Sequence, residues 1–241
     1  MSNITRKYFF VLFAFIGLAS LSSCRFGKVK GSGHQITENR KVESFDRIEV
    51  SGAYEVKLKQ DSTLSISVTA DDNLMKHIRT NVSGGKLHIF SKRSLSSVKP
   101  MVLVIGVKSL NEVKVSGAVD IEGLGRINTT NFSLNISGAS KVKLDLSAAD
   151  VSTEARGATE IYMSGQAASH KVKLTGAGKL FAYDFVVGDY KINTAGATHC
   201  EINVLKNLAV DSRGASEVSY KGNPSNVSNH KSGASSINKA N

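Results

Sequence analysis

A short phrase recurs along the chain and constrains its fold more than any other feature. It is Ser-Gly-Ala in four copies, and Arg, Thr or Ala replaces the serine in the others. From the second copy onward the glycines are 18 to 21 residues apart, after a first interval of 65 residues. The eight glycines are Gly52, Gly117, Gly138, Gly157, Gly176, Gly196, Gly214 and Gly233. A fixed period of about 20 residues is typical of a solenoid, in which each repeat packs on its neighbours.

The residues around each glycine alternate between apolar and polar, which predicts strands joined by a Gly-Ala bend. Glycine suits such a bend because it tolerates positive φ and close backbone approach. The position four residues after the glycine is always apolar or cysteine: Val56, Ile121, Val142, Ile161, Leu180, Cys200, Val218 and Ile237. We therefore predict an all-β fold, a parallel β-helix (β-solenoid) with about 20 residues per coil and these residues pointing inward. Strand-crossover chirality predicts that it is right-handed.

A second column, three residues after the glycine, alternates in charge. It contains Asp120, Lys141, Glu160, Lys179, His199 and Glu217. If successive coils stack, opposite charges become neighbours on the outer surface, and a slipped register is disfavoured. Chance alternation on a solvated face is the alternative explanation.

The first residues have the organisation of an export signal rather than of a folded domain. Arg6 and Lys7 precede an apolar run from Tyr8 to Leu18, which is short for a transmembrane helix. Small residues then precede Cys24, and this arrangement resembles the bacterial lipobox. The resemblance implies a signal peptide over 1–23, lipid attachment at Cys24 and therefore membrane anchoring. An ordinary secretory signal with an incidental cysteine is the alternative.

After the anchor, we interpret residues 24–33 as a lipidated, flexible basic tether and residues 34–110 as a β-rich capping portion. The capping portion is expected to contain one short helix after Asp71 and a hairpin with Gly84-Gly85 at its tip. Repeats then continue over 111–241, as one domain with the cap. The second cysteine, Cys200, occupies an inward column, so we expect a small buried apolar residue rather than a reactive thiol.

The charge of the chain points away from nucleic acid, although its formal net charge is +11. The basic residues are spread without a cluster or an aromatic-interleaved patch, and the export signal argues for a different compartment. Glycans or anionic envelope polymers are the more suitable partners. An aromatic cluster around residues 181–190 fills the core or forms a stacking platform for sugars. The candidate ligand contacts are Tyr183, Tyr190 and Phe185.

Four motifs follow one another along the chain. They are the stretch from Phe45 to Val56, the residues Ala70 to Leu74, the Gly84-Gly85-Lys86-Leu87 hairpin and the later Ser-Gly-Ala repeats. This order resembles the DUF2807 family, whose members are called putative auto-transporter adhesin, head GIN domain proteins and are frequent among Bacteroidetes lipoproteins. The resemblance covers about residues 40–220. It implies a β-helical fold and an envelope location, and it transfers no activity and no site residues.

We find no catalytic, metal or cofactor motif in the sequence. The histidines are scattered without metal-ligand spacing, and no nucleophile elbow is present. We therefore predict a non-enzymatic, lipid-anchored envelope protein, most simply on the periplasmic or surface face of the outer membrane, with an adhesin-like or glycan-binding surface. A scaffold that self-associates through its coil ends is the alternative, and a β-helical polysaccharide-degrading enzyme is a more remote one. The oligomeric state is left open.

Overall fold

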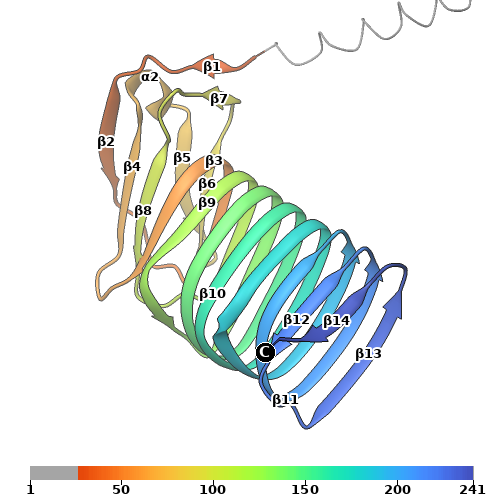
Figure 1. Cartoon of the computed structure of the whole chain (residues 1–241). Helices are drawn as coiled ribbons and strands as arrows, with labels where there is room; N and C mark the ends of the chain where they lie inside the picture. Colours follow the sequence, from red (N-terminus) through yellow and green to blue (C-terminus); the bar gives the residue numbers. More distant parts are fainter. Residues whose placement is uncertain (1–26, 241) are drawn as a thin grey trace, which may run out of the picture.

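The computed structural model describes residues 27–240, and most of them lie in β-strands (Figure 1). Among these residues the single helix is α2 (Asp72–Met75). The strands are β1 (Val29–Lys30), β2 (Gln35–Arg40), β3 (Arg47–Gln60), β4 (Ser65–Asp71), β5 (Ile78–Ser83), β6 (Lys86–Ser91), β7 (Leu95–Ser96), β8 (Val102–Val107), β9 (Glu112–Asn128), β10 (Asn131–Gly196), β11 (His199–Gly214), β12 (Glu217–Lys221), β13 (Asn226–Ser232) and β14 (Ser236–Lys239). The chain is therefore all-β, as the alternation of its residues predicts.

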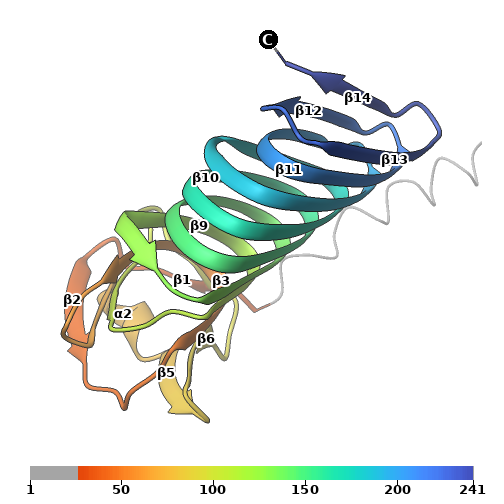
Figure 2. The same ribbon diagram turned by 90° about the horizontal axis from the view of Figure 1, so that it is seen from below.

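Successive turns of the chain, from β3 and β9 to β14, lie on one another along one axis (Figures 1 and 2). We call each turn a coil. Pairing between coils is parallel and follows the repeat: Val142 pairs with Ile121, and Leu180 pairs with Cys200. The predicted inward column is buried, since every member from Val56 to Val218 is at most 3% exposed. Like residues thus lie above like, and the apolar side chains fill the inside of the stack.

The glycine corners stack into a column in which neighbouring backbones are in close contact. Gly157 has a φ of +109°, and a Cβ built on it would lie 2.3 Å from the carbonyl oxygen of Gly138. A Cβ built on the repeat glycine of any other coil from Gly117 to Gly233 would lie 2.2 to 2.9 Å from the carbonyl oxygen of the preceding repeat glycine. No side chain fits at such a distance, so the close approach explains why each copy of the phrase keeps its glycine.

The first complete coil, β3, has different neighbours on its two sides. It pairs in parallel with β9 on one side, and with β6 and β8 on the other. The predicted hairpin is present, because β5 and β6 are antiparallel and Gly84-Gly85 joins them. β8, β4 and β2 then continue the sheet as antiparallel neighbours.

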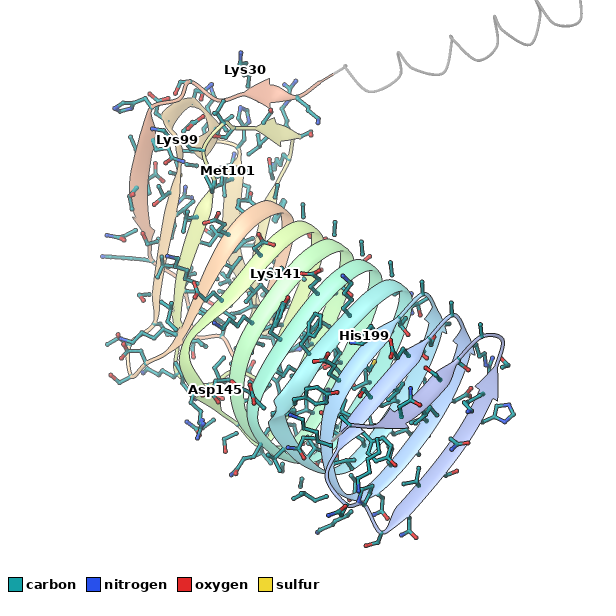
Figure 3. All side chains as sticks on the ribbon, viewed as in Figure 1. Lys30, Lys99, Met101, Lys141, Asp145 and His199 are labelled. Carbon is teal, nitrogen blue, oxygen red and sulfur yellow. The ribbon has the colours of Figure 1, made fainter. Side chains whose placement is uncertain are left out.

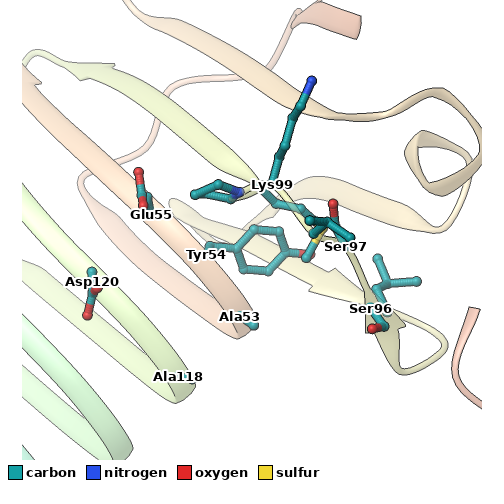
Figure 4. Close-up of a pocket in the computed structure, with 12 residues that line it drawn as sticks. Ala53, Tyr54, Glu55, Ser96, Ser97, Lys99, Ala118 and Asp120 are labelled. Atoms are coloured by element: carbon teal, nitrogen blue, oxygen red, sulfur yellow. The ribbon is translucent and has the colours of Figure 1, made fainter. Parts of the chain in front are cut away.

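Between β6 and β8 the chain makes a long excursion over residues 91–101, which we call the strap. Ser51 pairs with Phe90 and Glu55 pairs with Val102, so the strap takes the place of a glycine corner. Tyr54 lies between the strap and the first coil, and its ring would contact a Cβ at Gly52 at 2.8 Å (Figure 4). The tyrosine is 4% exposed and closes this end of the glycine column.

The predicted helix begins after Asp71, but the carboxylate of Asp71 forms no capping hydrogen bond to the helix. Its Oδ2 instead accepts hydrogen bonds from Ser97 Oγ at 3.0 Å and from the Gly33 N–H at 3.3 Å. A buried carboxylate needs such donors, and here they come from the strap and from the segment after β1. Asp71 therefore joins three separate parts of the cap.

The expectation of a flexible tether over 24–33 needs correction for its second half. Val29 and Lys30 form β1, which pairs in parallel with Leu95 and Ser96 of the strap. The Val29 N–H donates to the Ser94 carbonyl at 2.8 Å. The composition suggests a free linker, but the strap offers an unpaired strand edge that satisfies these backbone groups. Residues 24–26 lie outside the described residues.

At the other end of the stack, the apolar pattern fades as predicted. Every residue of β13 is exposed, and the inward position Ile237 of β14 is only partly buried.

Among residues 27–240, no helix has the length and hydropathy needed to cross a membrane.

The glycine column makes a direct prediction for stability. Gly157→Ala places a side chain at positive φ and against a backbone oxygen, so we expect a loss of at least about 2 kcal/mol in the free energy of unfolding. Gly125→Ala is the matched control, because Gly125 also has positive φ (+151°) but has nothing within 4 Å of its Cβ position. Urea unfolding measures both variants, and equal losses would contradict the stacking explanation.

Candidate functional site

Three aromatic side chains lie together on the outside of the coils, and we call them the aromatic face: Tyr162, Phe181 and Tyr183. Tyr162 and Phe181 each come five residues after the glycine of their coil, and Tyr183 comes seven after it. Inward residues occupy the fourth position, so these odd positions alternate outward. All three side chains are partly buried on the outer surface rather than in the core.

The stacking of coils brings Tyr162 and Phe181 into contact. Their ring centroids are 4.8 Å apart and their planes differ by 21°. Lys141 Nζ lies 5.2 Å from the Tyr162 centroid, within the range of a cation–π contact. Neighbours therefore cover both faces of the Tyr162 ring, and this part of the aromatic face serves mainly to hold the outer surface together.

Tyr183 has a different environment. Lys221 Nζ lies 4.5 Å from its ring centroid, and its hydroxyl donates a hydrogen bond to Ser219 Oγ at 2.7 Å. Both contacts come from one side, two coils further along the chain. On the other side the equivalent position of the preceding coil is Ser164, a small residue. The ring is thus held in place while space remains beside it.

That space is a groove of about 350 Å³, lined by Tyr183, Ser164 and Phe181 among others. Lys143, Asp184 and Glu201 also line it and supply an ammonium group and two carboxylates. The volume is that of a small-molecule site. A flat apolar ring beside charged hydrogen-bonding groups fits a polyhydroxylated ligand, whose C–H face packs on the ring while its hydroxyls bond to the charges.

The charged column predicted on the outer face is present in part (Figure 3). Glu160 Oε1 lies 3.4 Å from Lys179 Nζ, and Glu217 Oε2 lies 3.2 Å from His199 Nδ1. Asp120 and Lys141 are paired in register, but Lys141 packs on Tyr162. Pairs of this exposed kind contribute only about 0.2–1 kcal/mol each, so they specify register more than they add stability.

A polysaccharide-degrading enzyme would use clustered carboxylates, and two candidate carboxylates of the coils form ion pairs with basic residues of neighbouring coils. Asp145 Oδ1 lies 2.9 Å from Arg126 Nε. Glu154 accepts a hydrogen bond from Lys173, at 3.1 Å, and this contact lowers the pKa of its carboxyl group. Among residues 27–240, no group of three His, Cys, Asp or Glu side chains is arranged to hold a metal ion.

Of the three predicted ligand contacts, Tyr183 lies on the outer surface, whereas Phe185 and Tyr190 do not. Phe185 is 0% exposed and Tyr190 is 2% exposed, so both belong to the core. The pairing with β11 shifts between Ala182 and Val186, and this irregularity turns Phe185 inward directly after two outward residues. Tyr162 was absent from the prediction, although its position relative to the glycine, shared with Phe181, is a signal that would have found it.

The buried aromatics surround a histidine that the sequence pattern does not single out. His170 is fully buried, and its ring centroid is 5.6 Å from Phe185 and 5.1 Å from Tyr190. Its Nε2 is 2.9 Å from Thr153 Oγ1. Its Nδ1 and the Tyr190 hydroxyl have no hydrogen-bond partner among the described residues. Burial lowers the pKa of His170 to about 3, so the side chain is neutral in the folded protein.

The structure describes one of the two cysteines, Cys200. Cys200 is fully buried, and burial raises the pKa of its thiol to about 12. It is therefore a small core residue rather than a nucleophile, and His199 lies on the opposite, outer side of its strand. Cys24, the predicted lipidation site, lies outside the described residues.

The comparison with protein families adds to this geometry. The model described as "Putative auto-transporter adhesin, head GIN domain" (DUF2807) matches residues 44–224. The chain belongs to the DUF2807 family. The match begins just before the first coil and includes the strap, the glycine corners from Gly52 to Gly214 and the aromatic face.

Solved structures share the fold of this DUF2807 chain. A "putative adhesin" of Bacteroides fragilis is 20% identical, with a TM-score of 0.82, over 88% of this chain and 100% of that one. A "Putative lipid binding protein" of Parabacteroides distasonis is 21% identical, with a TM-score of 0.68, over 89% and 100%. A "putative adhesin" of Parabacteroides merdae is 18% identical, with a TM-score of 0.65, over the same shares. No curated protein matches the sequence.

The buried histidine predicts a pH dependence of stability. The folded-state pKa of about 3 lies below the ordinary 6.5, so on acidification the unfolded chain binds a proton here before the folded protein does. Stability is thus complete above pH 6.5 and falls toward pH 3. We expect the free energy of unfolding to decrease by about 2 kcal/mol between pH 7 and pH 5 from this group.

Urea unfolding at a series of pH values measures this effect. His170→Gln should flatten the decrease, whereas His230→Gln should leave it unchanged, because His230 is exposed. An equal decrease in the wild type and in His170→Gln would show that the histidine is not the cause.

Proposed function

We propose that this protein is a non-enzymatic lipoprotein of the bacterial cell envelope that binds glycans through the groove beside Tyr183. The observation that carries the proposal is the partly buried Tyr183 ring on the outer surface, held by Lys221 and Ser219 on one side. Its other side opens on a groove with charged groups. Aromatic rings beside carboxylates are a surface that polyhydroxylated ligands recognise. The adhesin descriptions of the family and of its solved members agree with a binding role.

The location follows from the beginning of the chain. An apolar run after Arg6 and Lys7, followed by small residues and Cys24, supports export and lipid attachment at Cys24. We place the anchored protein at the outer membrane, on its periplasmic or surface face. A lipid anchor with the tether would hold the fold close to the membrane and leave the coils free to contact polymers.

We further infer that the coils form a right-handed parallel β-helix, with residues 34–110 as its cap and 111–241 as its repeats. Parallel pairing at intervals of about 20 residues supports the β-helix, and the chirality of parallel crossovers supports the hand. Such a rod presents the same outer columns on successive coils, which suits the recognition of an extended polymer.

Self-association through the coil ends is the second function that the sequence suggests. The strand edge of the last coil is exposed, which would permit pairing with another chain. Its side chains, however, are mostly Asn, Ser, His and Lys, and the first coil is covered by the cap. A polar last coil is typical of a solvated end, so we favour the binding role.

Binding can be tested with an array of bacterial and host glycans. The wild type should bind at least one class, and Tyr183→Ala should weaken that binding by at least about tenfold, the effect of removing a central aromatic contact. Leu205→Ala is the matched control, because Leu205 is 51% exposed but does not line the groove. Equal binding by wild type and Tyr183→Ala would exclude the groove.

The anchor can be tested in cells by metabolic labelling with palmitate. The wild-type chain should incorporate the label and fractionate with membranes, and Cys24→Ala should do neither. Cys200→Ala is the control, since Cys200 is in the core and should not affect labelling. Label that persists in Cys24→Ala would refute the proposed attachment site.

A further inference from the structure

The strap and β1 form one surface at the end of the molecule where the chain enters the fold (Figure 1). Val29 and Lys30 pair with Leu95 and Ser96. The Gly31 N–H also donates to the Ser96 carbonyl at 2.8 Å, and the Asp71 carboxylate links the two segments as described above. The strap is therefore fixed to the segment that leads directly to Cys24.

This attachment limits how far the strap lies from a lipid at Cys24. Val29 is five positions after Cys24, and an extended chain over five positions spans at most roughly 18 Å. If Cys24 carries the lipid proposed above, the strap stays close to the membrane surface. The next question is whether the chemistry of the strap fits that surface.

The strap and β1, taken together with Lys28 directly before β1, carry five exposed cations: Lys28, Lys30, Lys92, Arg93 and Lys99. None of them forms a salt bridge with another residue of the described chain. Figure 3 shows Lys30 and Lys99 at this end, and in Figure 4 the Lys99 side chain extends away from the coils.

The carboxylates near this surface are occupied or turned to other groups. Asp71 is buried and accepts the hydrogen bonds of the cap. Asp72 accepts a hydrogen bond from Ser32 Oγ at 2.6 Å. Glu55 and Asp120 lie on the coils, at the far side of the cavity beneath the strap (Figure 4). The outer side of the strap is therefore positively charged.

An apolar side chain is placed at the tip of the same surface. Val98 is 91% exposed, the highest value among the exposed large hydrophobic side chains of the described residues, and it precedes Lys99 and Pro100. Entry of this side chain into a bilayer interface would remove its apolar area from water, which is favourable. Together with neighbouring lysines and an arginine, Val98 matches the pattern by which proteins contact the interface of an anionic bilayer.

We propose that the strap and β1 are a membrane-contacting surface, whose five cations bind anionic phospholipid headgroups while Val98 enters the interface. The proposal rests on the lipid anchor proposed above for its biological setting. It adds an electrostatic attachment to the lipid anchor.

Vesicle sedimentation tests the surface separately from the lipid. The mature chain with Cys24→Ser keeps every described residue, and it is mixed with vesicles of phosphatidylcholine alone or with added phosphatidylglycerol. We expect binding to the anionic vesicles only, decreasing with salt. Lys92→Gln/Arg93→Gln/Lys99→Gln should weaken binding about 100-fold, since each cation contributes about fivefold. Val98→Ser should weaken it by up to about tenfold.

The matched control is Lys171→Gln/Lys191→Gln/Lys206→Gln, which removes the same charge from exposed positions on the coils and should bind like the wild type. Circular dichroism confirms that each variant is folded. Equal loss in the strap and coil variants would overturn the proposal, as would binding to a soluble acidic polysaccharide in place of vesicles. Palmitate labelling is measured independently, so vesicle binding without labelling would refute the anchor alone, and labelling without vesicle binding would refute the surface alone.

Discussion

Close backbone contact at the glycine corners is the constraint on which the rest of the structure depends. A Cβ at Gly157 would lie 2.3 Å from the carbonyl oxygen of the coil before it. The corner therefore admits only glycine, and the repeat period of the sequence becomes the period of the stack. Once the corners are aligned, each strand residue lies beside its counterpart in the next coil, and the alternation of the strand assigns it to the inside or the outside.

The candidate functional sites lie where the regular repeat of the stack is interrupted. Columns of charge on the outer face pair with one another and leave little chemistry free, as Glu160 and Lys179 illustrate. The groove beside Tyr183 exists because a large residue follows a small one, Ser164, in the same column. The strap exists because one corner is replaced by an excursion. The groove lies on the side of the coils, and the cationic strap lies at the end where the chain enters the fold.

Much of the fold could be predicted from the sequence, because residues at equivalent positions of successive repeats become neighbours in the stack. The inward column from Val56 to Val218, the hairpin at Gly84-Gly85 and the burial of Cys200 were all predicted correctly. The sequence left open whether Phe185 and Tyr190 belong to the core or contact a ligand, and the structure buries both. For Phe185, a shift in register between Ala182 and Val186 changes which residues point inward. Alternation alone does not reveal such a shift.

By itself the sequence determined the period, the all-β class and the inward columns, because each depends on residues close together in the chain. Only the tertiary structure decided that His170 is buried beside Tyr190, that β1 pairs with the strap, and that Val98 is exposed among cations. These three features depend on contacts between segments that do not occupy equivalent positions of the repeat, so the sequence pattern does not predict them. The physical reason is that the burial and the strand pairing of a residue depend on which residues surround it, and the tertiary fold determines those surroundings.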